Sequence, residues 1–392
     1  MQEGDLIISK DANIGEAAIL DKNYSNYTLS GALYKLPITK NKFYLFAFLK
    51  HHFFRSQLDL LVPKGSTIRH AKTLFLDCKI PFPNQKNANE IIKYVELLVQ
   101  AVINKEKEIR RKNQLIFDLI EQEISENQKE NKFEYKTPKF NELILNLRID
   151  SGYYCHDYKE KQFKISNYKY GAATIDKWKF EIKRGQNLQI SQIGKSIYSD
   201  KSKENFYTTI KPTNFSEFGT VKKFEYLGNP KKLQTIKKGD IVITATGTVG
   251  KCIHPKEKWI TNIQGIVLKK KDNNIRESAF ISCFLRFLRY WGVLDYISVG
   301  GQGGSLAQKY WKDILIPNFS EQKQQEISSL YYNPKDYPKN LNLENFLQND
   351  QSWNQQAGIL ELDKLIKKIK EHLNKILDKI VNDEKVEANF NF

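Results

Sequence analysis

The sequence predicts an α+β protein in which two globular domains are joined by long helices that form an antiparallel coiled coil. Three observations predict this class: a duplicated strand-and-loop block, a second duplicated block further on, and a long helical pattern after each copy. The copies lie about 235 residues apart, far beyond the period of a solenoid, so we infer that a whole domain is duplicated.

The first duplicated block opens on Gly-Asp. EGDLIISKDANIGEAAIL at 3–20 aligns without gaps on KGDIVITATGTVGKCIHP at 238–255. The runs LIIS and IVITAT are short, apolar and bounded by Gly-Asp and glycine, which is typical of buried strands between tight turns. A weaker strand pattern follows in each copy, and then an aromatic helical stretch, with predicted strands at 28–36 and 262–269 and predicted helices at 43–60 and 278–296.

The second duplicated block ends on Ile-Pro. GSTIRHAKTLFLDCKIPFP at 65–83 matches GQGGSLAQKYWKDILIPNF at 301–319. Because proline cannot continue a strand ladder or an ordinary helix interior, Ile80-Pro81 and Ile316-Pro317 each predict the end of a strand before a connector helix.

Long helical patterns follow both copies, from Glu90 to Ser125 and from Leu360 to Val381, with apolar residues mostly three or four apart. Either helix alone could be an amphipathic surface helix. Their matched positions favour pairing with each other, because a long helix with a narrow apolar face usually packs on another helix. We expect an antiparallel seam in which one set of apolar residues meets another: Leu98, Val102, Ile116 and Leu119 against Leu365, Ile369, Leu373 and Ile376.

These patterns divide the chain into a first domain at 1–89, a central connector helix at 90–130, a second domain at 131–322, and a connector with the C-terminal helix at 323–392. The second copy has about 90 residues, from Arg148 to Lys238, before its Gly-Asp strand, whereas the first has only a few. We therefore expect the first domain to be incomplete at its N-terminus. Either the sequence is a fragment of a longer product, or another polypeptide supplies the missing half.

Composition favours a polyanionic partner. The net charge of +17 and the pI of about 9.3 suit nucleic acid, although an AT-rich genome would also raise the lysine content. The four cysteines are scattered without paired spacing, which argues against a disulfide framework or a zinc site and is consistent with a reducing cytoplasm: Cys78, Cys155, Cys252 and Cys283. No apolar run approaches the roughly 18 residues of a membrane span, so we expect a cytoplasmic protein without membrane contact.

The candidate DNA contacts lie in the duplicated loops, where polar and basic side chains surround glycines. Such side chains donate to phosphates and base edges, and glycine lets backbone amides approach an anion; the alternative is an ordinary polar surface loop. The candidates are Lys64, Ser66, Thr67, Arg69, His70 and Lys72 in the first copy, and Thr246, Thr248, Lys251, Gln302, Ser305, Gln308 and Lys309 in the second.

No catalytic motif is recognisable, so we expect no catalytic, metal-binding or cofactor-binding residues in this chain. TATGTVGK at 244–251 lacks the Gly-Lys-Ser/Thr ending of a phosphate loop. There is no Asn/Asp-Pro-Pro-aromatic segment of an amino-methyltransferase. Asp313, Glu321 and Lys323 loosely suit a nuclease, but the end of the repeat explains them better.

The two modules and their helices resemble the specificity subunits of type I restriction–modification systems. The segment RIDSGYY at 148–154 adds to this, because it is similar to a stretch that often opens a target-recognition domain in these subunits and in fused type IIG enzymes. The resemblance implies that each domain reads one half of a split site in double-stranded DNA. It also implies that the helices act as a ruler and bind two DNA methyltransferase subunits, which would carry S-adenosylmethionine, alongside restriction subunits.

Two other interpretations remain open. The chain could be the C-terminal recognition region of a fused type IIG restriction and methylation enzyme, or a stand-alone coiled-coil DNA-binding protein.

Overall fold

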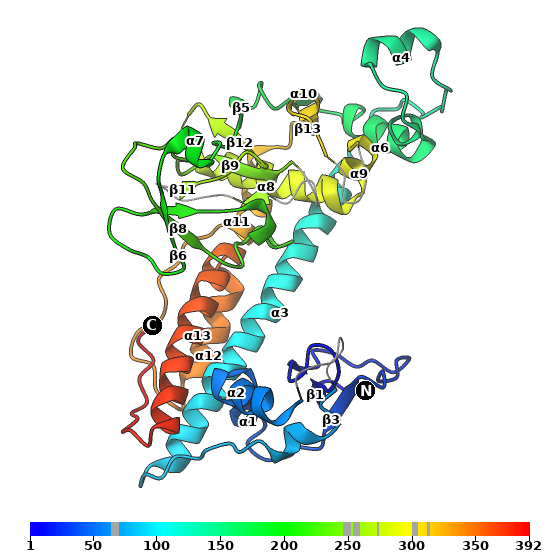
Figure 1. The fold of residues 1–392 in the computed structure, drawn as a ribbon. Helices are drawn as coiled ribbons and strands as arrows, with labels where there is room; N and C mark the ends of the chain where they lie inside the picture. Colours follow the sequence, from blue (N-terminus) through cyan, green and yellow to red (C-terminus); the bar gives the residue numbers. More distant parts are fainter. Residues whose placement is uncertain (64–69, 246–251, 254–258, 273, 300–304, 312–313) are drawn as a thin grey trace. The chain divides into compact units, whose positions relative to one another are not determined.

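The computed structural model describes residues 1–63, 70–245, 252–253, 259–272, 274–299, 305–311 and 314–392 (Figure 1). The chain forms two compact units. The N-terminal unit comprises residues 1–109, 335–357 and 361–392, and the central unit comprises residues 110–334 and 358–360. Each unit thus combines globular and helical parts, so the four-part division expected from the sequence stays a prediction.

A three-stranded antiparallel sheet forms the core of the N-terminal unit, in the order β2-β1-β3. The strand expected after the first Gly-Asp is present as β1, and the weaker strand expected before residue 36 is present as β3. Leu6, Ile8, Phe54, Leu58 and Phe75 are buried together. The elements are β1 (Leu6–Ser9), β2 (Ala17–Ile19), β3 (Leu33–Leu36), α1 (Lys42–Lys50), α2 (His52–Leu61) and the 3-10 helix η1 (Leu74–Asp77).

The helical stretches expected at 43–60 and 278–296 are confirmed, and each is divided into two helices by a single break. In the first, His51 adopts an extended backbone (φ −83°, ψ 150°), and its Nδ1 accepts a hydrogen bond from the Phe53 N–H at 3.4 Å. In the second, Gly292 has a φ of 77°, a left-handed conformation that ends one helix and begins the next.

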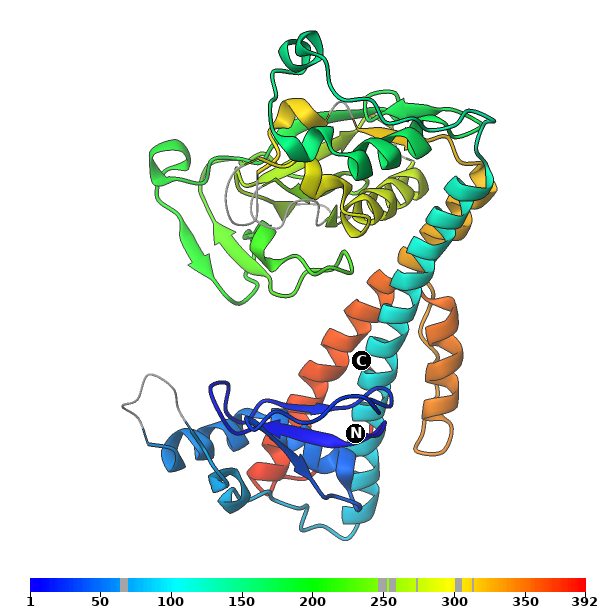
Figure 2. The ribbon, with the colours of Figure 1, turned by 90° about the vertical axis from the view of Figure 1, so that its right-hand side faces the viewer.

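Three helices contribute to the N-terminal unit: α3 (Ala88–Glu126) through its residues 88–109, α12 (Phe346–Gln356), and α13 (Ile359–Val381) through its residues 361–381. Within this unit α3 and α13 lie side by side and run antiparallel (Figures 1 and 2). The Gln85 side-chain amide, just before α3, accordingly donates to the Glu384 carbonyl, just after α13. Further along α3, Glu106 meets Lys370 at 2.7 Å. The antiparallel helix pair predicted from the sequence is confirmed, and both helix boundaries fall within two residues of those expected.

The central unit is built on two four-stranded sheets, β10-β9-β12-β5 and β11-β7-β8-β6, and a two-stranded pair, β13-β4. The helix α8 is almost wholly buried and packs against β10. The strands of the central unit are β4 (Ala172–Thr174), β5 (Phe180–Arg184), β6 (Ile197–Ser199), β7 (Tyr207–Thr209), β8 (Glu225–Gly228), β9 (Ile241–Thr244), β10 (Cys252–Ile253), β11 (Trp259–Ile260), β12 (Gly265–Lys270) and β13 (Leu315–Pro317). Its helices are α4 (Phe140–Asn146), α5 (Ser151–Tyr154), α6 (His156–Ser166), α7 (Ile190–Ile193), η2 (Pro212–Asn214), α8 (Ile275–Tyr290), α9 (Val293–Ile297), α10 (Gln308–Trp311) and α11 (Glu321–Tyr331).

The sheets of the two units share an arrangement. The central strand is β1 in one and β9 in the other, and it lies between two antiparallel neighbours in both. Among the described residues, a fourth strand, β5, is present in the central unit alone. The strand expected at Ile80-Pro81 does not form, whereas Ile316-Pro317 does form one by pairing with β4. The physical reason is the lack of a partner strand: the described part of the N-terminal unit contains no counterpart of β4 that could complete the ladder.

Among the described residues, no helix is both long and apolar enough to cross a membrane.

Candidate nucleic-acid interface

In each unit the two segments marked by the duplication are held together by the same kind of hydrogen bond. In the N-terminal unit, the Ala71 N–H donates to the Lys10 carbonyl at 2.7 Å, just after β1. In the central unit, the Leu306 N–H donates to the Ala245 carbonyl at 2.9 Å, just after β9. Ala71 and Leu306 are both fully buried. The second duplicated segment therefore meets the Gly-Asp strand of each unit at the end of that strand.

A further contact anchors each loop. His70 Nδ1 lies 2.8 Å from Asp11 Oδ1, and these two residues also form an isolated β-bridge. In the central unit, Val299 and Ser305 exchange two backbone hydrogen bonds of 2.8 and 2.7 Å. Both duplicated segments are thus held at the described residues that flank them.

The structure places only some of the predicted DNA contacts. Nine of them lie outside the described residues, at least in their side chains: Lys64, Ser66, Thr67, Arg69, Thr246, Thr248, Lys251, Gln302 and Lys309. Lys72 is exposed with a φ of 48°. Gln308 is exposed, but its Nε2 already donates to the Ile182 carbonyl of β5 at 2.9 Å. The described candidates therefore flank the two loop bases, and their role in DNA contact stays a prediction.

The duplicated Gly-Asp closes a turn at the start of each central strand. Asp240 Oδ2 accepts from the Lys237 N–H at 2.9 Å, and Asp5 Oδ2 accepts from the Gln2 N–H at the same distance. Gly4 and Gly239 have φ values of 82° and 97°, which favour glycine. Burial raises the pKa of Asp240. In contrast, the pKa of Asp5 is lowered by its hydrogen bond with the Gln2 backbone and by Lys35.

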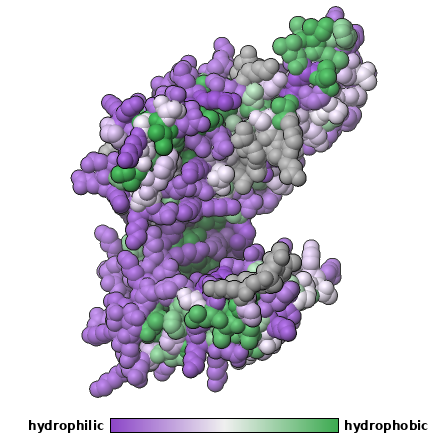
Figure 3. All heavy atoms as spheres, viewed as in Figure 1, coloured by the Kyte–Doolittle hydropathy of each residue, from purple (hydrophilic) through white to green (hydrophobic). Residues whose placement is uncertain are grey.

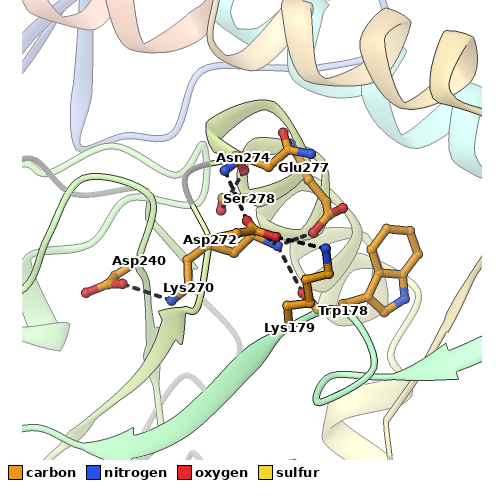
Figure 4. Close-up of polar contacts among 8 residues, drawn as sticks. All are labelled: Trp178, Lys179, Asp240, Lys270, Asp272, Asn274, Glu277 and Ser278. Atoms are coloured by element: carbon orange, nitrogen blue, oxygen red, sulfur yellow. Dashed lines mark hydrogen bonds and ion pairs between the residues drawn. The ribbon is translucent and has the colours of Figure 1, made fainter.

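Asp240 also tethers β12, because its Oδ1 accepts from the Lys270 N–H at 3.0 Å (Figure 4). The Lys270 ammonium donates to the Trp178 carbonyl at 3.0 Å, pairs with Asp272 at 3.3 Å and contacts Glu277. The Gly-Asp motif and its partners thus stabilise the sheet from within, so a structural requirement explains this part of the duplication.

RIDSGYY has a structural role as well. The Arg148 guanidinium makes a bidentate ion pair with Asp150 (2.8 and 2.6 Å) and donates to the Ile297 carbonyl at 2.8 Å. It lies between the rings of Tyr153 and Tyr310, at 4.6 and 4.7 Å from their centroids. Burial opposes the charge of Arg148, but its pKa is raised overall by Asp150. The motif therefore fastens the start of the second module to α9.

The predicted helix seam is divided between the two units. Leu98 and Val102 are buried in the N-terminal unit, as are the four predicted residues of α13: Leu365, Ile369, Leu373 and Ile376. Ile116 and Leu119 belong to the central unit, where Ile116 is buried and Leu119 half-buried. In that part of α3, Phe117 stacks on Tyr290 of α8 with a centroid distance of 4.6 Å. The proposed pairing of individual seam residues stays a prediction.

Sequence reasoning missed a buried ion pair between helices. Lys105 of α3 contacts Asp350 of α12, and both side chains are almost completely buried. Tyr337 donates to Asp350 Oδ1 at 2.6 Å, and Asn354 donates to its Oδ2 at 3.0 Å. The Lys105 ammonium also lies close to two rings, 5.7 Å from the centroid of Tyr337 and 5.5 Å from that of Trp353. Lysine inside an apolar helical pattern was the available signal, but nothing local indicated a partner so distant in sequence.

A second cluster missed from the sequence joins α13 to the α1–α2 break. The ligand atoms of His51, His52 and Asp378 lie within 4.8 Å of one another, a spacing that could suit a metal ion. His51 Nε2 lies 3.3 Å from Asp378 Oδ1. Because His51 Nδ1 accepts the Phe53 N–H, the neutral ring carries its proton on Nε2 and offers no lone pair there. We therefore interpret the cluster as a polar contact between helices.

Comparison with known proteins identifies the class of the N-terminal part. Residues 1–115 match the family model of the type I restriction modification DNA specificity domain. This match covers 115 of the 392 residues and supports the resemblance noted in the sequence. None of the curated proteins matches the chain.

Several solved structures are similar over most of the chain. A type I restriction–modification S subunit from M. genitalium is 15% identical, with a TM-score of 0.49 over 97% of this chain and 83% of that one. The HsdS subunit from Thermoanaerobacter tengcongensis is 13% identical, with a TM-score of 0.33 over 97% and 81%. A chain from a type I R-M complex is 12% identical, with a TM-score of 0.34 over 97% and 82%.

Proposed function

We propose that this chain is the DNA sequence-recognition subunit of a type I restriction–modification complex and carries out no catalysis itself. The observation that supports this best is the repetition of one loop anchor in two units. The hydrogen bonds from Ala71 to Lys10 and from Leu306 to Ala245 join the two duplicated segments in the same way in both units. Two equivalent reading surfaces suit a DNA site split into two halves.

The chemistry of these loops is that of recognition. Their lysines, arginine and hydroxyl groups can donate to phosphates, and their glutamines can pair with base edges. The charge of +17 would strengthen binding to the phosphate backbone. In this proposal the chain positions methyltransferase subunits, which bind S-adenosylmethionine, and restriction subunits, so that its choice of sequence directs their reactions.

The α3–α13 pair would set the distance between the half-sites. Seven residues add two helical turns, or about 10 Å, and duplex DNA rises about 3.4 Å per base pair. The structure indicates where to insert them. Lys105 and Glu106 contact α12 and α13, so an insertion between 105 and 108 would disrupt the N-terminal unit. Matched seven-residue helical insertions after Ile109 and before Glu361, where the compact units meet, preserve those contacts.

The test is methylome sequencing of cells that express the complex with both insertions. We expect an unread spacer longer by about three base pairs and unchanged half-site sequences. The control is an insertion of equal length at the exposed turn around Asn340, which should leave the spacer unchanged. An unchanged spacer with both helices lengthened would contradict the ruler.

The genes beside this one separate the other interpretations. A methyltransferase fused in frame would favour the type IIG enzyme, and the absence of any methyltransferase would favour a stand-alone DNA-binding protein. Failure of the purified complex to bind DNA would contradict all three.

A further inference from the structure

One arginine of the central unit lies in the protein interior. Charged side chains usually reach water, and the face of the molecule in Figure 3 is largely hydrophilic. Arg286 of α8 is instead only 2% exposed. In the described part of the chain its Nε–H has no hydrogen-bond acceptor, and no carboxylate pairs with its guanidinium. Burying such a cation costs free energy unless its surroundings compensate the charge.

The contacts of Arg286 link α8 to α3. Its Nη1 donates to Asn113 Oδ1 at 2.6 Å, and Asn113 is also buried. Its Nη2 donates to Cys283 Sγ at 3.6 Å. Burial raises the pKa of the Cys283 thiol, which therefore stays neutral and supplies no counter-charge. The shortest polar contact of Arg286 is thus the one that joins the two helices.

Other parts of the central unit enclose the guanidinium. The Tyr331 ring of α11 lies over it, with its centroid 4.6 Å from the guanidinium carbon. The Tyr331 hydroxyl donates to the Gly219 carbonyl at 2.8 Å. A Cβ at position 219 would lie only 3.1 Å from Arg286 Nε, so the backbone passes close to the side chain there. Little room is left for the guanidinium to turn away from Asn113.

Asn113 differs from its neighbours on the same face of α3. The residues one helical turn away share the lack of a side-chain hydrogen-bond acceptor, and they are Ile109, Arg110, Ile116 and Phe117. If α3 slid by one turn along its axis, the guanidinium would face an apolar side chain or a second cation. In coiled coils a single buried polar residue fixes the register of helices in this way, at a cost in stability.

We propose that Arg286 and Asn113 form a register lock, which holds α3 at one position along the central unit. Arg286 is then a positioning residue that acts through α3. Because α3 continues into the N-terminal unit, the register lock also sets the length of the ruler. This second consequence rests on the proposed function, whereas the register lock itself does not. A slide of one turn is about 5.4 Å, which would change the unread spacer by roughly one or two base pairs.

The test removes the register lock without leaving a buried charge. In the full chain, Arg286→Met with Asn113→Leu gives an apolar pair, so the Tm should stay close to that of the unaltered chain. Nitroxide labels on unnatural amino acids at Asp118 of α3 and Gln322 of α11, which are both exposed, report the register by pulsed electron paramagnetic resonance. We expect one distance in the unaltered chain. The double variant should show a second distance, or a distribution wider by up to about 5 Å.

Two further variants are the controls. Asn113→Asp keeps an oxygen opposite Arg286 and adds a counter-ion, so the single distance should persist. Tyr168→Phe removes another hydrogen bond between the central unit and α3, the one from the Tyr168 hydroxyl to Glu123 Oε1 at 2.7 Å. This variant should lower the Tm without producing a second distance.

The register lock is wrong if the double variant keeps the single distance of the unaltered chain. A double variant that no longer folds would also overturn it, because the pair would then supply stability that apolar contacts cannot replace. So would equal broadening by Tyr168→Phe or by Asn113→Asp. Methylome sequencing separates the register lock from the proposed function. A second distance with mixed spacer lengths supports both, whereas a second distance with one spacer length supports the register lock and contradicts the ruler.

Discussion

Removing the Asp350 carboxylate should destabilise the N-terminal unit more than any other single change in its helices. Asp350→Ala leaves the Lys105 ammonium buried without a counter-ion, and burial already lowers the pKa of Lys105. Breaking a buried pair by removing one partner costs about 3–5 kcal/mol. A domain of this size loses about 2–4 °C of Tm per kcal/mol, so we expect the Tm of this unit to fall by roughly 6–20 °C.

The double variant Lys105→Met, Asp350→Asn tests the cause. It removes both charges, and the introduced asparagine amide keeps an oxygen that can accept from Tyr337, so most of the lost stability should return. Lys107→Met is the matched control. Lys107 is on the same helix and pairs with Glu3, but Lys107 is only half-buried and Glu3 is exposed, and surface pairs of this kind contribute at most about 1 kcal/mol. Hydrogen exchange of the α3 and α12 amides assigns any loss to this unit. If Asp350→Ala costs no more than Lys107→Met, the ion pair does not anchor α12.

Further predictions concern DNA binding and pH. The affinity of the complex for DNA should fall steeply with salt, by a log–log slope of about 0.9 per neutralised phosphate, and a flat titration would contradict an electrostatic role for the positive charge. Gln302→Ala with Gln308→Ala should relax the base choice at one half-site, whereas Lys309→Ala should weaken all sequences alike; a binding-site selection experiment compares them. Burial lowers the pKa of His51, with a contribution from His52, and burial also lowers that of His372. The unfolded chain therefore takes up protons first, so the N-terminal unit should lose stability as the pH falls below about 6.5. Thermal melts between pH 7.5 and 5 check this, and His51→Asn should flatten the profile.

The regular parts of the fold could be predicted because their signals are local. The 3.6-residue period gave α3 and α13 to within two residues, and the Gly-Asp boundaries located β1 and β9. The breaks at His51 and Gly292 were missed because an aromatic helical pattern continues across both. The strand expected at Ile80-Pro81 failed for a different reason. Strand formation there depends on a partner, and a pattern within one segment does not contain that information.

The candidate site was less predictable than the fold. The duplication correctly marked two loop segments that meet in each unit, since the Ala71–Lys10 and Leu306–Ala245 bonds join them. The duplication could not distinguish residues that stabilise the sheet from residues that remain candidates for DNA contact. Asp240 and Arg148 are used internally, and Gln308 is partly used, because their partners come from other elements. The Lys105–Asp350 pair was invisible for the same reason, as its members are far apart in sequence.

The N-terminal unit is discontinuous, and this has a consequence for its biosynthesis. Residues 1–109 leave the ribosome first, but α12, α13 and the tail that buries Phe390 against Tyr94 and Phe346 lie beyond residue 334. At roughly 5–20 residues per second, translation of 110–334 takes some tens of seconds. During that time the apolar face of the first part of α3 has no partner helix, while the largely contiguous central unit can already fold. Newly made chains should therefore depend on chaperones mainly through their N-terminal segment, and premature termination before α13 should yield an aggregating product that still contains a folded central unit.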